Sequence, residues 1–273
     1  MTSAETDTSR DTCVARAAAR LTAAERDGVP CAPVRDTLGD TDVALAYAVQ
    51  QRVVEGHLAA GRRVVGRKIG LTSPAVQAQL GVDQPDFGVL FADMDVSGPG
   101  AVSTDRLLQP KVEAEIAFVL AADLDGPDLT PDVVRAAVDH AVAALEIVDS
   151  RVSGWDIRIT DTVADNASSA LYVLGERRVP LSDFDPVDVV MTLHVDGEQV
   201  SSGTGAACLG DPLHALRWLA QTARDLGQPL RAGQVVLSGA LGPMVPVVPG
   251  TTVTAELSVL GTVTARFSSG ADA

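Results

Sequence analysis

Two glutamates stand two positions apart in a stretch that otherwise has the character of a buried strand. The stretch is Q-P-K-V-E-A-E-I-A-F-V-L (residues 109–120), and its acids are Glu113 and Glu115. Successive side chains of a strand point to opposite faces, so both carboxylates lie on one face, with Cα atoms roughly 7 Å apart. Carboxylates on one face repel each other and are costly to bury without a cation. The pattern therefore indicates either a cation site or the water-exposed face of a half-buried strand.

Glu146 offers a third carboxylate. It is the only acid in A-A-L-E-I-V and follows a predicted helix, so it is either part of the same site or a residue at that helix's C-terminus. The helix dipole disfavours an acid at that end. Three carboxylates without thiolate or imidazole form an all-oxygen ligand set, which suits Mg²⁺ or Mn²⁺ better than zinc. The four histidines are scattered without metal-site spacing: His57, His140, His194 and His214.

Lys68 is a candidate for acid–base chemistry or anion binding. It lies between Gly66 and Gly70 on its own face of the strand-like stretch G-R-K-I-G-L-T. Glycines on both sides would leave room for a ligand against the backbone. The lysine could then bind an anionic group, or act as an acid or base if desolvation lowers its pKa. The simpler interpretation is a lysine at a sheet edge. Asp86, in G-V-D-Q-P-D-F-G, is on its own more simply explained as a turn aspartate.

Apolar periodicity and turn residues predict the elements that position these side chains. Helices are expected over residues 12–27, 41–60, 130–145 and 211–226, with a disordered lead over 1–11 and a short helix opening at Ser73-Pro74. Strands are expected over 63–72, 87–92, 111–120, 234–239 and 252–267 (with a turn at 260–262), and a hairpin over 189–200 with an Asp196-Gly197 turn. Residues 152–169 have no regular pattern, and 203–210 predict a turn closely packed on the core.

This order of elements predicts an α+β fold, because it lacks the regular alternation of strands and helices that parallel sheets require. A helical N-terminal segment, residues 1–62, would pack on a mixed, mostly antiparallel β-rich catalytic core, residues 63–273. The second helix would be capped by Asp40 or Thr41. We expect the two parts to form one continuous functional unit.

Composition excludes some classes of protein. The chain has 273 residues, of which 46% are hydrophobic, enough for one large domain. Its net charge of −15 argues against nucleic-acid binding, which needs a cationic face. The three cysteines (Cys13, Cys31, Cys208) form no C-x-x-C pair and indicate free thiols in a reducing compartment. The polar, acidic N-terminus is unlike a signal peptide, and no apolar run has membrane-spanning length, so we expect a soluble cytoplasmic protein.

Four segments in this order closely resemble the 2-keto-4-pentenoate hydratase family of the fumarylacetoacetate-hydrolase-like superfamily. They are residues 66–94, 109–120, 144–151 and 161–175, within a resemblance that extends over residues 41–268. The resemblance implies a β-roll or sandwich core of the fumarylacetoacetase C-terminal type. Some members of the family carry an aromatic residue where this chain has Arg67, which should face away from Lys68.

The resemblance also implies roles for the candidate residues. Glu113, Glu115 and Glu146 match metal-binding carboxylates, with Mg²⁺ or Mn²⁺ as the cofactor. Lys68 and Asp86 match polar catalytic residues. Ser168 and Ser169 lie in the segment that approaches the substrate, and the sequence leaves open which of them contacts it.

The implied activity is that of a hydro-lyase in a meta-cleavage pathway for aromatic or steroid compounds. It would convert 2-hydroxypenta-2,4-dienoate to 4-hydroxy-2-oxopentanoate: a proton shifts to carbon 5, water adds at carbon 4, and carbon 3 is protonated while the metal holds the substrate oxygens. Two alternatives are a 2-oxo-3-hexenedioate (4-oxalocrotonate) decarboxylase and a catalytically silent assembly subunit. The resemblance further implies a homo-oligomer that associates with a pathway aldolase or decarboxylase.

Overall fold

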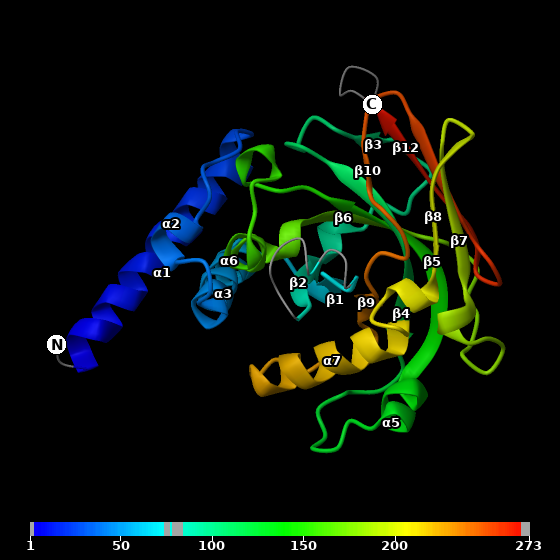
Figure 1. Ribbon diagram of the computed structural model, residues 1–273, viewed down its shortest axis with the longest axis horizontal. Helices are drawn as coiled ribbons and strands as arrows, with labels where there is room; N and C mark the ends of the chain where they lie inside the picture. The colour runs from blue at the N-terminus through cyan, green and yellow to red at the C-terminus, as the bar shows by residue number, and fades with distance from the viewer. Residues whose placement is uncertain (1–2, 74–76, 78–83, 269–273) are drawn as a thin grey trace.

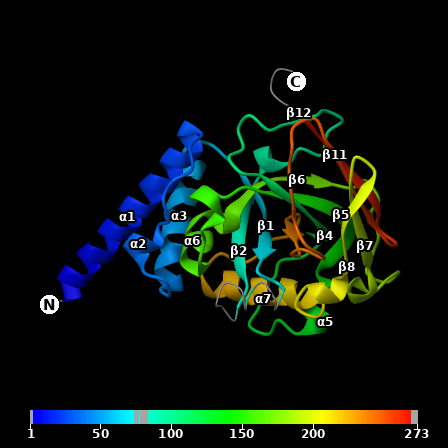
Figure 2. The same cartoon turned by 45° about the horizontal axis from the view of Figure 1, so that its top comes forward.

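Two β-sheets and the helices around them build the molecule (Figure 1, Figure 2). The computed structural model describes residues 3–73, 77 and 84–268. The larger sheet contains β1 (Val64–Gly70), β2 (Asp86–Phe91), β4 (Lys111–Leu120), β5 (Val138–Val148), β6 (Ser169–Leu174), β9 (Val235–Leu237) and β10 (Val245–Pro246). Its strands lie in the order β2-β1-β9-β4-β5-β6, and β10 pairs with β4.

The smaller sheet has five strands in the order β3-β12-β11-β7-β8. They are β3 (Val102–Ser103), β7 (Val190–Val195), β8 (Glu198–Thr204), β11 (Thr252–Leu257) and β12 (Gly261–Ser268). The described strand pairs are antiparallel except for β1 with β9 and β3 with β12, which are parallel. The predicted α+β fold with a mixed, mostly antiparallel core is therefore confirmed.

The main apolar core lies between the two sheets. β11 and β12 pack on β5, and aliphatic side chains such as Leu145, Leu193 and Val253 fill the space between the sheets. The predicted helix α7 (Pro212–Asp225) is present and begins at Asp211, whose carboxylate accepts a hydrogen bond from Leu213 N at 2.8 Å. α7 packs on β1 and on α5 (Pro131–Ala136), which extends this core below the sheet in Figure 1.

Three N-terminal helices form a layer on one side of the core (Figure 1): α1 (Ser3–Asp27), α2 (Arg35–Leu38) and α3 (Val43–Ala59). They share a separate apolar cluster with α6 (Ile159–Ala164). The expected disordered lead over residues 1–11 is wrong from Ser3 onward, where α1 begins. The cap of α3 is Asp42, which accepts from Leu45 N at 2.9 Å, and not Asp40 or Thr41.

The largest difference from the sequence prediction concerns residues 130–145. Thr130 does cap a helix, but only the short α5 forms, and β5 begins at Val138 and continues through Glu146. β5 lies between β4 and β6 and is buried on both faces over most of its length. Such a strand requires a continuous apolar run, which periodicity cannot distinguish from a buried helix. The predicted helix is wrong beyond α5, and Glu146 does not lie at a helix C-terminus.

Other differences are smaller. Residues 152–169, expected to be irregular, contain η2 (Ser153–Trp155), α6 and η3 (Asn166–Ser168). The β7–β8 hairpin turns at Asp196-Gly197 as predicted, both with positive φ. The β11–β12 turn lies over residues 258–260 and not over the predicted 260–262. The short helix predicted from Ser73-Pro74 lies largely outside the described residues. Within the described part of the chain, no helix is both long enough and apolar enough to cross a membrane.

Two glycines are required by close backbone contacts. A Cβ atom on Gly66 would lie 2.0 Å from the carbonyl oxygen of Val235, across the parallel β1–β9 pair. A Cβ atom on Gly203 would lie 1.8 Å from the carbonyl oxygen of Leu241, so the predicted close packing of residues 203–210 on the core is confirmed. Because these neighbours are backbone atoms, the space cannot be made by rotating a side chain.

Gly66→Ala is expected to destabilise the protein by about 1–3 kcal/mol or more, because the added methyl group forces β1 away from β9. The free energy of unfolding in urea measures the effect. Gly56→Ala is the control: it lies in α3, and nothing is within 4 Å of its would-be Cβ. This control should be neutral or slightly stabilising, and equal stability of the two variants would show that the β1–β9 contact is not constrained as described.

Candidate active site and metal centre

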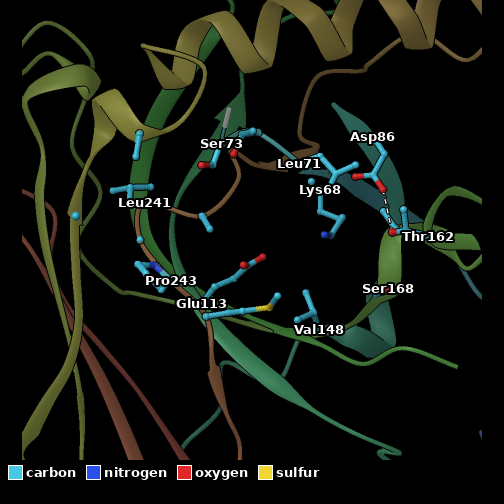
Figure 3. Close-up of a pocket in the computed structure, with 18 of the residues that line it drawn as sticks. Lys68, Leu71, Ser73, Asp86, Glu113, Val148, Thr162, Ser168, Leu241 and Pro243 are labelled. Carbon is cyan, nitrogen blue, oxygen red and sulfur yellow. Dashed lines mark hydrogen bonds between the residues drawn. The ribbon is translucent and has the colours of Figure 1, made fainter. Parts of the chain in front are cut away.

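A cavity of about 630 Å³ opens over one face of the larger sheet. Its lining comes from β1, β2 and β4, from α6 and η3, from β8, and from residues 240–244 (Figure 3). The polar residues of the lining include Lys68, Asp86, Glu113 and Ser168, which the sequence had singled out from four separate segments. The fold therefore brings these candidates to one place.

Glu113, Glu115 and Glu146 form a buried carboxylate cluster. Glu113 on β4 is the direct cross-strand partner of Glu146 on β5, and each of the three residues offers an oxygen atom within 4.8 Å of the others. Glu115 and Glu146 are 0% exposed, whereas Glu113 is partly exposed where it lines the cavity, so this face of the strand is not that of an ordinary water-exposed strand. Gly239 N donates to Glu115 Oε2 at 2.7 Å, whereas Glu115 Oε1 and Glu146 Oε2 have no hydrogen-bond partner among the described residues.

The electrostatics of the cluster are unfavourable without a cation. Burial raises the pKa of all three carboxyl groups, and it raises that of Glu146 to about 7. The neighbouring carboxylates add to the effect, since like charges directly opposite each other on paired strands are destabilising. The cluster is thus a hard, all-oxygen ligand set that could hold a cation.

Lys68 is the cation that the chain itself brings to this cluster. Its Nζ lies 3.1 Å from Glu146 Oε1, and the two side chains are 3% and 0% exposed. Burial acts to lower the pKa of Lys68, but the carboxylates of Glu146, Glu113, Asp86 and Glu115 outweigh burial, and the net pKa is raised. The lowered pKa that acid–base use of this lysine was said to need is therefore not found, because these four carboxylates outweigh desolvation. The alternative of an edge position is also wrong, since β1 lies between β2 and β9.

The glycines beside Lys68 make room for protein atoms and not for a ligand. Gly66 admits the backbone of Val235, as described above. A Cβ atom on Gly70 would lie 2.2 Å from Asp86 Oδ1 and 3.6 Å from Lys68 Nζ. Gly70 therefore lies where the Lys68 ammonium and the Asp86 carboxylate, the two candidate catalytic groups, approach each other.

Asp86 is the first residue of β2, and it is 1% exposed. Its Oδ2 accepts a hydrogen bond from Thr162 Oγ1 at 3.0 Å (Figure 3), and its Oδ1 has no hydrogen-bond partner among the described residues. Burial raises its pKa against the opposing effect of Lys68. The interpretation as a turn aspartate is wrong, since the side chain is buried at the cavity wall.

The structure separates the two candidate serines. Ser168 lines the large cavity, and its Oγ is buried without a hydrogen-bond partner in the described part of the chain. Ser169 instead faces a second cavity of about 30 Å³, together with His57 and Arg151. Asn166, Ala167 and Ser168 have φ values of 53°, 52° and 53°, a left-handed conformation that residues other than glycine seldom adopt in succession.

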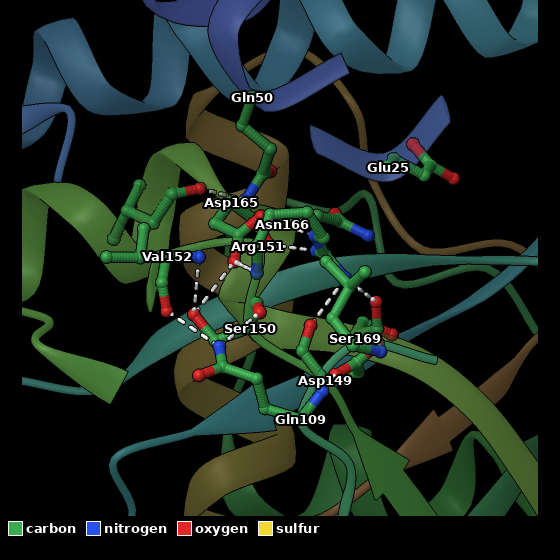
Figure 4. A network of polar contacts seen from close by, with 12 residues as sticks. Glu25, Gln50, Gln109, Asp149, Ser150, Arg151, Val152, Asp165, Asn166 and Ser169 are labelled. Carbon is green, nitrogen blue, oxygen red and sulfur yellow. Dashed lines mark hydrogen bonds and ion pairs between the residues drawn. The ribbon is translucent and has the colours of Figure 1, made fainter. Parts of the chain in front are cut away.

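A buried network around Arg151 holds this strained segment (Figure 4). Arg151 donates to the carboxylate of Asp165 and to the carbonyl oxygens of Asp149 and Ser169. Asp149 N in turn donates to Ser168 O at 2.7 Å. The side-chain amide of Asn166 pairs with both backbone groups of Val89 on β2, at 2.7 and 3.0 Å. These bonds determine where Ser168 lies.

Sequence reasoning missed several residues of this site. Thr162 and Asp165 lie in D-T-V-A-D-N, a stretch whose polar character was visible but whose contacts were not. Gly239 has φ 103°, and its N–H reaches Glu115; no sequence pattern singled it out. The apolar lining, which includes Trp155, Leu241 and Met244, comes from distant segments and left no local signal. None of the four histidines is part of the carboxylate cluster.

Comparison with known proteins places this arrangement in a family. Residues 63–268 match the family model for the fumarylacetoacetate (FAA) hydrolase C-terminal domain. Among curated proteins, the chain is 56% identical to "TodF product hydratase" of Pseudomonas putida strain F1, over 97% of this chain and 98% of that protein. It is 55% identical to "2-keto-4-pentenoate hydratase" of Burkholderia vietnamiensis, over 95% and 99% of the two chains.

Solved structures agree with this relationship. The 4-oxalocrotonate decarboxylase from Pseudomonas putida G7, complexed with magnesium and adipate, has a TM-score of 0.89 and 35% identity over 94% of this chain and 98% of that one. Fumarylpyruvate hydrolase from Pseudomonas aeruginosa has a TM-score of 0.62 and 17% identity over 75% and 89%, a likeness of fold alone. The chain belongs to the 2-keto-4-pentenoate hydratase family, within the group that shares the fumarylacetoacetate hydrolase C-terminal fold.

Proposed function

We propose that this protein is a metal-dependent hydratase that adds water to 2-hydroxypenta-2,4-dienoate and forms 4-hydroxy-2-oxopentanoate in a meta-cleavage pathway. The observation that carries the proposal is a buried cluster of three carboxylates, beside Lys68 and Asp86, at the wall of a large cavity. Relatives that are 55–56% identical to this chain are named as hydratases.

The carboxylate cluster fits a divalent cation, with Glu113, Glu115 and Glu146 as its ligands. Glu115 and Glu146 each keep a buried oxygen without a hydrogen-bond partner among the described residues, as a ligand atom would. Oxygen ligands alone favour Mg²⁺ or Mn²⁺, and the similar decarboxylase was solved with magnesium. When bound, such a cation supplies Lewis-acid stabilisation of negative charge on substrate oxygens.

The remaining polar residues can bind the substrate and move protons. Lys68, kept as an ammonium by its carboxylate neighbours, stabilises negative charge on the oxygen-bearing end of the dienoate. Asp86, with a raised pKa and a free Oδ1, can carry a proton between water and the carbon chain, while Thr162 fixes its other oxygen. Ser168 Oγ is unpartnered among the described residues and faces the large cavity, which supports Ser168 rather than Ser169 as a donor to the substrate carboxylate.

One observation favours hydration over decarboxylation. Among the described residues that line the cavity, Lys68 is the only cationic side chain, and it is already paired with Glu146. A 2-oxo-3-hexenedioate substrate would bring a second carboxylate, for which the described lining residues offer no second cationic side chain. A substrate with a single carboxylate fits better.

The decisive experiment offers the protein both substrates with Mg²⁺ or Mn²⁺ and identifies the products. Loss of dienol absorbance with formation of 4-hydroxy-2-oxopentanoate is expected, and treatment with EDTA should abolish it. Release of CO₂ from 2-oxo-3-hexenedioate without hydration would instead identify a decarboxylase. Inactivity toward both substrates would favour a silent assembly subunit.

Glu146→Gln is expected to weaken Mn²⁺ binding by about 100-fold or more, because an amide oxygen replaces a charged ligand. Turnover at limiting metal should fall in parallel, while the circular dichroism spectrum is retained; Glu113→Gln should behave similarly. Calorimetric titration with Mn²⁺ measures the affinity. Glu256→Gln, an exposed glutamate on β11, is the matched control and should bind Mn²⁺ normally. Unchanged affinity in Glu146→Gln would remove this residue from the ligand set.

Lys68→Met is expected to lower kcat by about 10²–10⁴-fold, the usual contribution of a positioned acid–base or charged group. The metal-free variant should also unfold at a lower temperature, because Glu146 loses its buried partner. Added Mg²⁺ should recover part of this loss, since a ligand that binds only the folded state stabilises it. A normal kcat in Lys68→Met would exclude the lysine from catalysis.

A further inference from the structure

The candidate proton carrier Asp86 lies on an edge strand of the larger sheet. It is the first residue of β2, which pairs with β1 on one side and, among the described strands, has no strand on its other side. All six residues of β2 are buried. Unpaired backbone groups along a buried edge are costly, so other groups must bond to them. What holds this free edge of β2 therefore determines where Asp86 lies.

Side-chain amides bond to this free edge where a neighbouring strand would otherwise pair. The amide of Asn166 bonds to both backbone groups of Val89. Gln50 Nε2 donates to Phe87 O at 2.8 Å. Phe87 and Val89 are two positions apart, and alternate residues of an antiparallel strand direct their backbone groups to the same edge. Gln50 is 4% exposed and belongs to α3, so the N-terminal helical segment reaches the strand that carries Asp86.

The same amide nitrogen also holds the segment that carries Thr162. Gln50 Nε2 donates to Val163 O at 2.9 Å, and Figure 4 shows Gln50 reaching down from α3. Val163 lies in the last turn of the short helix α6, where carbonyl oxygens lack partners within the helix. Gln50 thus joins the residue after Asp86 to the residue after Thr162. The side chains of Asp86 and Thr162 are themselves bonded to each other at 3.0 Å (Figure 3).

A second side chain of α3 contacts the same strand. Tyr47 lies one turn before Gln50, on the same face of the helix, and its ring stacks on Phe87 with the ring centroids 4.9 Å apart. Burial raises the pKa of Tyr47, and the negative charge of Asp86 raises it further, so the phenol stays neutral beside the carboxylate. α3 therefore contacts Phe87 through both a ring and an amide, and Phe87 follows Asp86 directly in the chain.

We infer that Gln50 is a positioning residue for proton transfer by Asp86. It holds β2 and α6 together so that Thr162 bonds to Asp86 Oδ2, and Oδ1 stays free of hydrogen bonds from the described residues. Gln50 is not among the described residues that line the cavity, so it acts through its neighbours and not on the substrate. This inference rests on the proposed function, and it makes the N-terminal helical segment part of the catalytic unit.

Gln50→Met removes both hydrogen bonds and keeps the length and approximate volume of the side chain. The kcat for 2-hydroxypenta-2,4-dienoate should fall about 10- to 100-fold, because a small displacement of an acid–base group has an effect of this size. KM and Mn²⁺ affinity should not change, since the carboxylate cluster and Lys68 keep their contacts. Calorimetric titration with Mn²⁺ also counts the intact sites, so kcat is expressed per intact site. An unchanged kcat, or a KM and Mn²⁺ affinity that deteriorate with it, would overturn the inference.

Gln51→Met is the matched control. Gln51 is the next residue of α3, and its side chain bonds to Glu55 and Gln228 instead of to β2 or α6. Its kcat should be normal, and equal losses in the two variants would contradict a specific role for Gln50. If Gln50→Met does not fold, Gln50→Glu takes its place, because it keeps the shape of the side chain and offers at most one donor. The same fall in kcat at unchanged KM is then expected, and a normal kcat would refute the positioning role.

A double variant tests whether Gln50 acts through the Asp86–Thr162 pair. Thr162→Val removes the hydrogen bond to Asp86. If Gln50 aligns this pair, the losses of kcat in Gln50→Met and Thr162→Val should be less than additive when combined, because residues that share partners are energetically coupled. The losses in the urea midpoint of unfolding should likewise be less than additive. Additive losses in either measurement would show that Gln50 does not act through this pair and would refute the inference.

The two measurements separate failure of the inference from failure of the proposed function. Hydration by the unaltered protein, together with a normal kcat in Gln50→Met, would refute the positioning role and leave the hydratase intact. No hydration by the unaltered protein, with losses in the urea midpoint that remain less than additive, would refute the hydratase and retain Gln50 as the residue that aligns Asp86 and Thr162.

Discussion

The packing of three carboxylates beside one ammonium group, in a largely buried place, is the interaction on which the rest of the structure depends. Glu113 and Glu146 face each other across paired strands, and Glu115 lies on the same face. The three carboxylates therefore repel one another on one face of the larger sheet. Lys68, reaching from β1 to within 3.1 Å of Glu146, offsets only part of that charge. The apolar core around the cluster is large, and the three acids offer oxygen atoms close enough together that they could hold a cation.

The segments around the cluster are shaped by the need to keep it in position. Gly66 allows β1 to approach β9, Gly70 allows Lys68 and Asp86 to approach each other, and Gly239 turns the chain so that its N–H reaches Glu115. On the other side, the buried Arg151 and its bonds to Asp165 keep three successive residues in a left-handed conformation. Strain at Ser168 is thus balanced by a hydrogen-bond network outside the cavity.

Much of the candidate site was accessible from the sequence because strand periodicity is a local property. The bounds of β4 were predicted as they occur, and two of the three carboxylates were assigned to one face from spacing alone. The third was recognised, but the helix predicted before it was wrong, because alanine and valine in a strand covered on both faces resemble a buried helix. The direction of the Lys68 pKa shift could not be predicted, since it depends on carboxylates from other strands.

The amino-acid sequence by itself determined the α+β class, the placement of Glu113 and Glu115 on one face of their strand, and the turns at Asp196-Gly197 and before α7. Through family resemblance, it also determined the set of candidate residues. Only the tertiary structure decided that Glu113 lies opposite Glu146 and that Ser168 and not Ser169 reaches the large cavity. The physical reason is the range of the interactions. Propensity, turn chemistry and side-chain alternation act between neighbours in the chain, whereas charge pairing, burial and cavity shape arise from segments that only the fold brings together.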